Sequence, residues 1–397
     1  MKIKVGVIFG GESVEHEISI ITACQAMKNM DSDKYDIVPI YIAKDKQWYT
    51  GGMLKEVDVF KDFEDLKRFA TKVVLTKTDK GFELLKANGL FRKVVDYIDV
   101  AFPIVHGKGA EDGSLAGYLE SIGLPVCESN VLASALGQDK VIQKQILNAE
   151  GIKTPKYIWF FDNEFLDDPD SIIKSIKKLG FPVIVKPANL GSSIGIKIAK
   201  DENELAKAIN EAISYDNKIV VEEVIKNLQE VNCAVLGNYE YQETSSIIEM
   251  KTGHAFLTFE DKYIGNGKKK GQFKAAPKRG DSQLVLEAKL TKEMEEKVRE
   301  ISKKTFKTLN FSGVVRIDLL IDTKAKEVYV NEPNTIPGSL SFFMWKNNGK
   351  SYKQLLDDII SIAIKDYKNK SKKITSFDSN VLSSYSGSKG MKGSKKF

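Results

Sequence analysis

An alternation of short apolar runs with a helical pattern places the strongest constraint on how this chain folds. The apolar runs of its first part cover residues 2–9, 36–42 and 97–105. Residues 18–30, between the first two runs, have apolar side chains at helical spacing. This rhythm is typical of βαβ units, in which helices cover a parallel sheet. We therefore predict an open parallel α/β domain over residues 1–128.

Two glycine-containing turns follow predicted strands of this domain. Gly10 and Gly11 come after the first strand, and His106-Gly107 comes after the run that ends at residue 105. Ligands of open α/β sheets bind at the carboxyl ends of the strands. We therefore expect both turns to face one crevice.

The remainder is expected to form two mixed α+β domains and a tail. The second domain, residues 129–221, has predicted helices at 138–150 and 202–213 and strands at 181–186 and 218–221. The third domain, residues 222–370, has predicted strands at 231–236, 313–321 and 327–331 and a closing helix at 352–367. Residues 371–397 are rich in Ser, Gly and Lys, which predicts a disordered tail.

The position of the charge argues against a nucleic-acid partner. The chain has a formal net charge of +6, and from residue 371 on it has six lysines against one aspartate. The body is therefore almost neutral, whereas folded nucleic-acid-binding domains carry basic patches. A polyanion-binding or docking role of the basic tail remains an alternative.

The sequence does not indicate a membrane protein, a disulfide framework or a metal site built from histidines. No apolar stretch approaches the roughly 18 residues of a membrane span, and the first residues lack the features of a signal peptide. We therefore expect a cytoplasmic protein without a membrane partner. Cys24, Cys127 and Cys233 are far apart, and neither they nor the histidines have metal-ligand spacing. We expect the cysteines to be buried thiols.

The most informative polar residues are predicted on two neighbouring strands. Arg316 and Asp318 lie two residues apart on one strand, and Glu332 and Asn334 on the next. Because side chains alternate along a strand, each pair lies on one face. Two carboxylates and an amide suit Mg²⁺, beside a guanidinium that can bind phosphate. The alternative is a ladder of cross-strand salt bridges. Pro333 has no N–H, which predicts an edge strand or a bulge there.

A lysine and a glycine-bounded loop follow another apolar strand. Lys186 ends the strand, and Gly191 and Gly195 enclose two serines. Backbone N–H groups of such a loop can bind phosphate oxygens, although an ordinary hairpin turn is the alternative. The chain has neither a G-x-x-x-x-G-K-[ST] nor a G-x-G-x-x-G sequence, so any nucleotide site is of another kind.

Acidic residues crowd the turn before the first predicted helix. Glu12, Glu15 and Glu17 lie at its N-terminal end, where the helix dipole by itself stabilises negative charge. The functional alternative is capture of a substrate ammonium group. His106, at a strand end, is open either to a local hydrogen bond or to a substrate contact.

Taken in order, these segments resemble those of the D-alanine:D-alanine ligase family of ATP-grasp enzymes, from residue 1 to about residue 370. The resemblance implies a three-domain ATP-grasp fold that joins two D-alanines through an acyl phosphate, for peptidoglycan precursor synthesis. It implies amino-acid substrates, ATP and two Mg²⁺ ions, with Mn²⁺ able to replace them, and a homodimer.

The resemblance also implies roles for single residues. Glu15 would hold the amino group of the first D-alanine, with Ser192 and Tyr263 linked to it. Arg316 and the backbone N–H of Gly338 would stabilise the oxyanion of the reaction.

The other implied residues bind ATP, metal or substrate. Lys140 and Lys186 would contact phosphates, Glu222 and Ile225 would frame adenine, and Glu230 would hold the ribose. The metal ligands would be Asp318, Glu332 and Asn334. The substrate residues would be His106, Glu111, Lys262, Ser339 and Ser341, and residues 260–278 correspond to a mobile lid loop.

The sequence departs from the family after Gly338. The serine-containing run that grips the acceptor carboxylate is replaced by residues 339–345, which are rich in aromatic side chains. Ser339 or Ser341 would then replace the missing serine. One alternative is a ligase with another acceptor, such as D-serine, D-lactate or a different amino acid. Two others are an ATP-binding scaffold without turnover and an NAD-dependent dehydrogenase, although the glycine fingerprint of the latter is incomplete.

Overall fold

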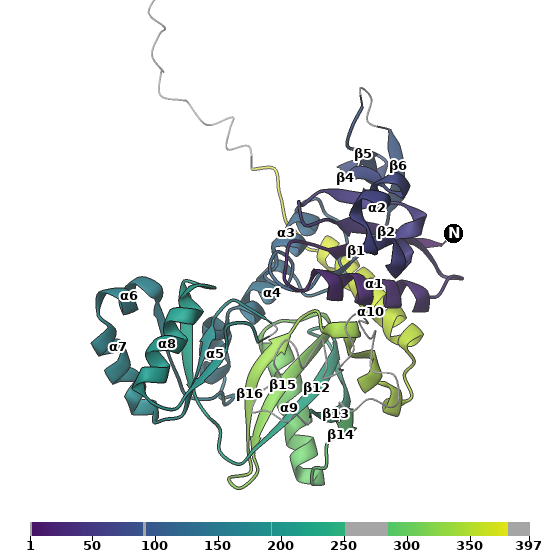
Figure 1. The fold of residues 1–397 in the computed structure, drawn as a ribbon. Coiled ribbons are helices and arrows are strands. Elements are labelled where there is room, and N and C mark those ends of the chain that lie inside the picture. The colour runs from purple at the N-terminus through teal and green to yellow at the C-terminus, as the bar shows by residue number, and fades with distance from the viewer. Residues whose placement is uncertain (1, 90–92, 192, 251–284, 380–397) are drawn as a thin grey trace, which may run out of the picture.

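The computed structural model describes residues 2–89, 93–191, 193–250 and 285–379. These residues form sheets of seven, four and five strands. In Figure 1 the seven-stranded sheet lies at the upper right, the four-stranded sheet with its helices at the left, and the five-stranded sheet below them. The predicted lid at 260–278 and residues 380–397 of the predicted tail lie outside the described residues.

The first sheet contains β1 (Ile3–Gly10), β2 (Tyr35–Ile42), β3 (Trp48–Thr50), β4 (Thr71–Thr78), β5 (Gly81–Lys86), β6 (Val94–Ile98) and β7 (Val100–Ile104). Strand β1 pairs in parallel with β2 on one side and with β7 on the other, as the βαβ rhythm predicted. Strands β3 to β6 add an antiparallel extension that the sequence patterns did not predict.

The run at 97–105, expected as one strand, is two strands with different partners. Asp99 separates them: its carboxylate accepts from the N–H of Lys4 at 2.8 Å, and its own N–H donates to the Lys4 carbonyl oxygen at 2.8 Å. The chain thus changes from pairing with β5 to pairing with β1. The sequence does not reveal this switch, because apolar residues lie on both sides of Asp99.

Helix α1 (His16–Asn29) follows β1, and η1 (Gly52–Lys55), η2 (Val57–Lys61), α2 (Phe63–Phe69) and α3 (Ser114–Ser121) complete this part. Ser19 of α1 is fully buried; its Oγ accepts from the Gly10 N–H at 2.8 Å and donates to the Ile104 carbonyl oxygen. Ser13 Oγ donates to the His106 carbonyl oxygen at 2.7 Å. The two glycine-containing turns therefore lie side by side.

Two helices lead into the second sheet, α4 (Val131–Gln138) and α5 (Lys140–Ala149). Asp139 begins α5 as its N-cap, because its carboxylate accepts from the N–H groups of Val141 at 2.9 Å and Ile142 at 3.0 Å. The predicted helix at 138–150 therefore starts two residues later than expected. Lys140 is thus the first residue of α5.

The second sheet is antiparallel and has the order β10-β9-β11-β8. Its strands are β8 (Tyr157–Phe161), β9 (Val183–Pro187), β10 (Lys197–Ala199) and β11 (Lys218–Glu223). Its helices are α6 (Asp162–Asp167), α7 (Pro169–Ile176), η3 (Lys177–Leu179) and α8 (Glu202–Ile213). The predicted helix at 202–213 is confirmed, and β11 continues across the predicted domain limit at 221/222.

The third sheet is also antiparallel, in the order β14-β13-β12-β15-β16. Its strands are β12 (Leu228–Gly237), β13 (Gln242–Met250), β14 (Val285–Glu287), β15 (Gly313–Asp322) and β16 (Glu327–Asn334). The helices after β14 are α9 (Lys292–Thr308), η5 (Gly338–Met344), η6 (Lys346–Asn348) and α10 (Tyr352–Ser371). Leu355, Leu356 and Ile359 of α10 share a buried cluster with the first sheet.

The cysteines, the closing helix and the start of the tail lie outside the candidate site. The three cysteines are buried free thiols, as predicted. Of the helices that the structure describes, none has the length and apolar character needed to cross a membrane. The closing helix runs to Ser371, four residues beyond its predicted end, and residues 372–379 of the tail are exposed.

Candidate active site

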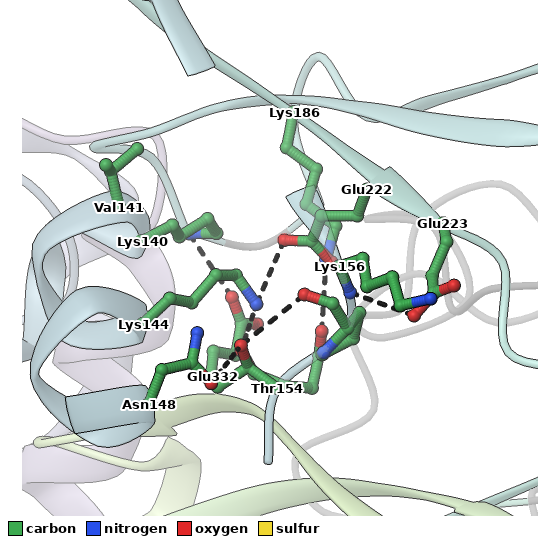
Figure 2. A network of polar contacts seen from close by, with 12 residues as sticks. Lys140, Val141, Lys144, Asn148, Thr154, Lys156, Lys186, Glu222, Glu223 and Glu332 are labelled. Atoms are coloured by element: carbon green, nitrogen blue, oxygen red, sulfur yellow. Dashed lines mark hydrogen bonds and ion pairs between the residues drawn. The ribbon is translucent and has the colours of Figure 1, made fainter. Parts of the chain in front are cut away.

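A buried cluster of lysines and glutamates lies where α5, the second sheet and β16 meet (Figure 2). The Glu222 carboxylate is shared by two ammonium groups: Lys186 Nζ lies 2.9 Å from Oε2 and Lys144 Nζ lies 3.1 Å from Oε1. These three side chains are at most 6% exposed. Such burial is costly for charges unless they are paired, so the pairing explains how the cluster is tolerated.

The charge balance of this cluster favours an anion. Burial by itself would raise the pKa of Glu222, but Lys144 and Lys186 hold this pKa below its usual value. Burial would likewise lower the pKa of Lys186, and Glu222 and Glu332 raise it above the ordinary value instead. For Lys144 the effect of burial is larger than that of the Glu222 charge, so the pKa of Lys144 is lowered. Two lysines thus share one fully buried carboxylate, an arrangement that phosphate oxygens can complement.

A bulge in the third sheet brings β16 into contact with the same cluster. Asp318 pairs with Glu332 and Leu319 with Val330, so Asn331 is the extra residue on β16. Asn331 Oδ1 accepts from Lys186 Nζ at 3.0 Å. β16 is also an edge strand, so both features expected from the neighbouring proline are confirmed.

The register of β15 and β16 brings the predicted polar residues together. Arg316 lies opposite Asn334 and Asp318 lies opposite Glu332, so the four share one face. The Arg316 guanidinium donates to both Asp318 oxygens, from Nε at 2.6 Å and from Nη2 at 2.9 Å. Lys140 Nζ lies 3.2 Å from Glu332 Oε2. Both carboxylates are thus within reach of cations from this chain.

This donor set fits a divalent cation of the Mg²⁺ type. Asp318 and Glu332 supply carboxylate oxygens and Asn334 an amide oxygen, which are the hard ligands that Mg²⁺ prefers. Within the described ranges no group of three or more His, Cys, Asp and Glu side chains could hold a metal. A metal at this face would therefore take its remaining ligands from substrate phosphates and water, as Mg²⁺ commonly does.

The loop after Lys186 reaches from the lysine cluster to the first predicted substrate site. Lys140 Nζ donates to the Leu190 carbonyl oxygen at 2.6 Å, which ties the loop to α5. A Cβ added at Gly191 would lie 3.6 Å from Glu15 Oε2, so the backbone passes close to that carboxylate. Ser192, predicted to act with Glu15, lies outside the described residues, as do Lys262 and Tyr263.

Glu15 and Glu111 approach the turn at His106 from two sides. The Gly107 N–H donates to Glu111 Oε2 at 3.1 Å, and a Cβ at Gly107 would lie 3.1 Å from Glu15 Oε2. Burial and then the Glu15 charge raise the pKa of Glu111 to about 8. Burial lowers the pKa of His106. Burial in this site therefore favours the protonated form of Glu111 and the uncharged form of His106.

The turn predicted to face the acceptor has an unusual backbone. Ser339, Leu340 and Ser341 have φ values of 50°, 51° and 51°, so three consecutive side-chain-bearing residues are left-handed. Each such residue costs about 1–2 kcal/mol. Ser341 is fully buried, and Ser339 Oγ donates to Gln25 Oε1 at 2.9 Å. A Cβ at Gly338 would meet nothing within 4 Å, so the space beside it is open.

The residues predicted for adenine and ribose lie on the second and third sheets. Glu222 is on β11, Ile225 is buried in the segment between β11 and β12, and Glu230 is on β12. The charge of Glu230 reaches Lys186. Their contacts with a nucleotide stay a prediction.

Two residues of the cluster were missed by the sequence analysis. Lys144 is four residues after Lys140, a spacing that puts both on one face of α5, as Figure 2 shows. That spacing was available in the sequence. Asn331 was not predicted as a site residue, because its role depends on the bulge, which sequence spacing does not reveal.

A cavity of about 990 Å³ lies elsewhere, between α1 and the η2–α2 segment. Its walls include Ile20, Phe60 and Phe63, and its lining includes the ion pair of Lys44 with Glu17 at 2.9 Å. It contains none of the predicted site residues. The polar convergence described above, and not the size of a cavity, identifies the candidate active site.

Comparisons with known proteins identify the family and the fold. Family models described as D-ala D-ala ligase N-terminus and C-terminus match residues 4–129 and 146–361. A D-alanine–D-alanine ligase of Thermosipho melanesiensis is 38% identical over 382 residues, 96% of this chain and 98% of that protein.

Two solved structures are similar over almost the whole chain. The VanG D-Ala:D-Ser ligase of Enterococcus faecalis is 30% identical, with a TM-score of 0.76 and coverage of 91% of this chain and 100% of that one. The D-alanine–D-alanine ligase of Bacillus anthracis complexed with ATP is 28% identical, with a TM-score of 0.65 and coverage of 93% and 99%. The fold is thus of the ATP-grasp type that the resemblance implied. The chain belongs to the D-alanine–D-alanine ligase family of ATP-dependent ligases.

Proposed function

We propose that this chain joins two D-alanines to form D-alanyl-D-alanine, a peptidoglycan precursor, with ATP converted to ADP and phosphate. The observation that carries the proposal is the convergence of Lys140, Lys144 and Lys186 on the carboxylates Glu222 and Glu332. This convergence brings phosphate-binding cations next to the face suited to Mg²⁺. Family membership supports the choice of substrate.

The chemistry needs positioning and charge neutralisation more than a nucleophilic side chain. The carboxylate of the first D-alanine attacks the γ-phosphorus of ATP, and ADP leaves. The amine of the second D-alanine then attacks the carbonyl carbon of the acyl phosphate, loses a proton, and expels phosphate. Lys140 and Lys186 would offset the phosphate charge, and Arg316 and the Gly338 N–H would stabilise the oxyanion.

Asp318, Glu332 and Asn334 are proposed to hold two Mg²⁺ ions. When bound, these ions supply neutralisation of the triphosphate charge. Mn²⁺ has similar preferences for oxygen ligands and would support the reaction. In the absence of ATP, Arg316 and Lys140 compensate the carboxylates, which keeps the face from repelling itself.

The first amino acid is proposed to bind at the paired glycine turns. Glu15 would accept the ammonium group, and a protonated Glu111 beside it would not compete for that cation. Ser192 and Tyr263 would complete this site, and Lys262 the acceptor site. Residues 1–128 would thus supply the first-substrate site, and 129–221 and 222–370 would enclose ATP.

The chemical identity of the acceptor is less constrained by the site than that of the first amino acid. Phe342 stacks on Tyr352 with ring centroids 4.4 Å apart, next to the left-handed turn that carries Ser339 and Ser341. This aromatic packing gives the second candidate, a ligase that takes D-serine, D-lactate or another amino acid as acceptor. Ser339 or Ser341 is the proposed acceptor ligand, with His106 and Glu111 supporting the loop.

Phosphate release from Mg-ATP tests the proposal. Purified protein is given D-alanine alone, then D-alanine with D-serine, D-lactate, other D-amino acids or L-amino acids, and products are identified by mass spectrometry. Dipeptide from D-alanine alone supports the first candidate, and release only with a mixed pair supports the second. No release with any pair overturns both. Light scattering tests the accompanying proposal of a homodimer, and cell fractionation the proposed cytoplasmic location.

A further inference from the structure

A row of polar side chains runs along one face of α1. Ser19, Thr22 and Gln25 are spaced three residues apart, which puts them on one side of the helix. Ser19 and Thr22 are almost fully buried. Buried hydroxyl groups need hydrogen-bond partners, and here the partners lie on segments far apart in the sequence. The helix therefore connects several loops of the site.

Thr22 joins two of these segments through one oxygen atom. Its Oγ1 accepts from the Ser339 N–H at 3.3 Å and lies 3.2 Å from His106 Nε2. The Ser339 N–H can only donate, and the Thr22 hydroxyl still has a second lone pair and its own proton, so it can form a hydrogen bond with Nε2 in either His106 tautomer. On the other side of the ring, His106 Nδ1 lies 4.0 Å from Glu111 Oε1. One hydroxyl thus orients the imidazole and anchors Ser339.

Ser339 is the residue at which the left-handed turn begins. Backbone conformations of this kind persist only where the surroundings hold them. α1 supplies two such contacts to Ser339: Thr22 binds its N–H, and Gln25 Oε1 accepts from its Oγ at 2.9 Å. The turn therefore depends on α1 for its position.

We propose that Thr22 is a positioning residue that holds the turn at 338–344 in register with His106 and the first-substrate loop. The inference rests on the proposed function. Glu15 is the N-cap of α1, so the helix that presents the residue proposed for the first amino acid also fixes the turn proposed for the second. A rigid helix sets the distance between reacting groups more closely than two separate loops.

The variants Thr22→Val and Thr22→Ser test the role of the hydroxyl. Valine has nearly the shape of threonine but no hydroxyl, and serine keeps the hydroxyl. Phosphate release as a function of D-alanine concentration gives a KM for each amino-acid site. We expect T22V to raise the acceptor KM about tenfold, as for a lost hydrogen bond. The KM for ATP should change less than about twofold. T22S should restore the acceptor KM.

Thr50→Val is the matched control. Thr50 on β3 is a buried threonine, as Thr22 on α1 is, and its Oγ1 donates to the Pro39 carbonyl oxygen at 2.7 Å. T50V loses a comparable hydrogen bond away from the site, so all KM values should stay at wild-type level. Equal changes of every KM in T22V, an unchanged acceptor KM, or failure of T22S to restore it would overturn the inference.

A second measurement does not depend on turnover. The chain has three histidines, so ¹⁵N spectra with a His106→Gln variant assign the His106 nitrogens. The wild-type chemical shifts show which ring nitrogen carries the proton, and T22V should lose the hydrogen-bond signature of Nε2, whereas T22S should keep it. Should T22V not fold, Gln25→Leu is expected to raise the acceptor KM about threefold by removing the other contact.

The two proposals fail in different ways. Wild type that releases no phosphate with any pair of amino acids overturns the proposed function and this inference together. Active wild type with a T22V variant of normal acceptor KM overturns the inference alone.

Discussion

Lys186 and Glu222 form an ion pair inside the protein, with Nζ 2.9 Å from Oε2 and both side chains at most 6% exposed. They lie on the neighbouring strands β9 and β11. Lys144 approaches the other oxygen of the same carboxylate at 3.1 Å. One carboxylate is thus shared by two ammonium groups, an arrangement that suits the binding of a polyphosphate.

Glu222→Gln should destabilise the protein by about 3–5 kcal/mol, because it leaves two buried ammonium groups without their carboxylate. ATP affinity should fall as well, since the lysines lose their orientation. Urea unfolding and ATP titration measure the two effects. Glu223→Gln is the control, because Glu223 is partly exposed and accepts from the Lys156 N–H at 2.9 Å. Equal stability of the two variants would contradict this account.

Asp318→Asn should lower kcat by about 100-fold and raise the Mg²⁺ concentration needed for half-maximal rate. An amide still binds the Arg316 guanidinium weakly, so the fold should persist. Rate as a function of Mg²⁺ concentration checks this. The control is Asp322→Asn at the far end of the same strand, where the carboxylate accepts from the N–H groups of Lys324 and Ala325. A wild-type Mg²⁺ dependence in D318N would remove Asp318 as a metal ligand.

Glu111 should make the stability of the ligand-free protein depend on pH. Burial and then Glu15 raise its pKa from 4.5 to about 8. The folded state therefore binds more protons than the unfolded state between these values, and stability falls as pH rises through this window. The melting temperature of Glu111→Gln relative to wild type should be higher at pH 8 than at pH 5.

Glu17→Gln is the control for this pH effect. Burial would raise the pKa of Glu17, but its contact with Lys44 holds the pKa below 4.5. Its contribution is therefore constant between pH 5 and pH 8, and its difference from wild type should not change there. A pH-independent difference for E111Q would show that Glu111 is ionised in the folded protein.

Ser341→Ala should leave stability unchanged or raise it by up to about 1 kcal/mol, because the buried Ser341 hydroxyl has no hydrogen-bond partner among the described residues. Ser339→Ala should lower stability by about 0.5–1.5 kcal/mol through loss of the contact with Gln25. Thermal unfolding measures both. The acceptor KM of each variant then tells which serine, if either, binds the second amino acid.

Local patterns were sufficient for much of the site. The two-residue spacing of Arg316 and Asp318, and of Glu332 and Asn334, predicted side chains on one face, and the register of β15 and β16 confirms it. Pro333 predicted an edge or a bulge, and both occur. These predictions succeed because strand alternation and the missing N–H of proline act within a few residues.

The contacts of distant segments could not be predicted in this way. The switch of pairing partner at Asp99 depends on Lys4, and the sharing of Glu222 depends on Lys144 and Lys186. Each of these needs two or three elements to be in place at once. Sequence spacing contains no information on such distances.

The sequence by itself determined the family, many of the helices and strands, and most of the charged residues of the site, because these follow from local side-chain chemistry and motif order. Only the tertiary structure decided that Asn331 points to Lys186 through a bulge, and that Thr22 connects His106 with Ser339. These contacts join residues far apart along the chain. Their geometry comes from packing. Residues of α5, β9, β11 and β16 belong to buried clusters, and the packing of these clusters sets the positions of the elements relative to one another.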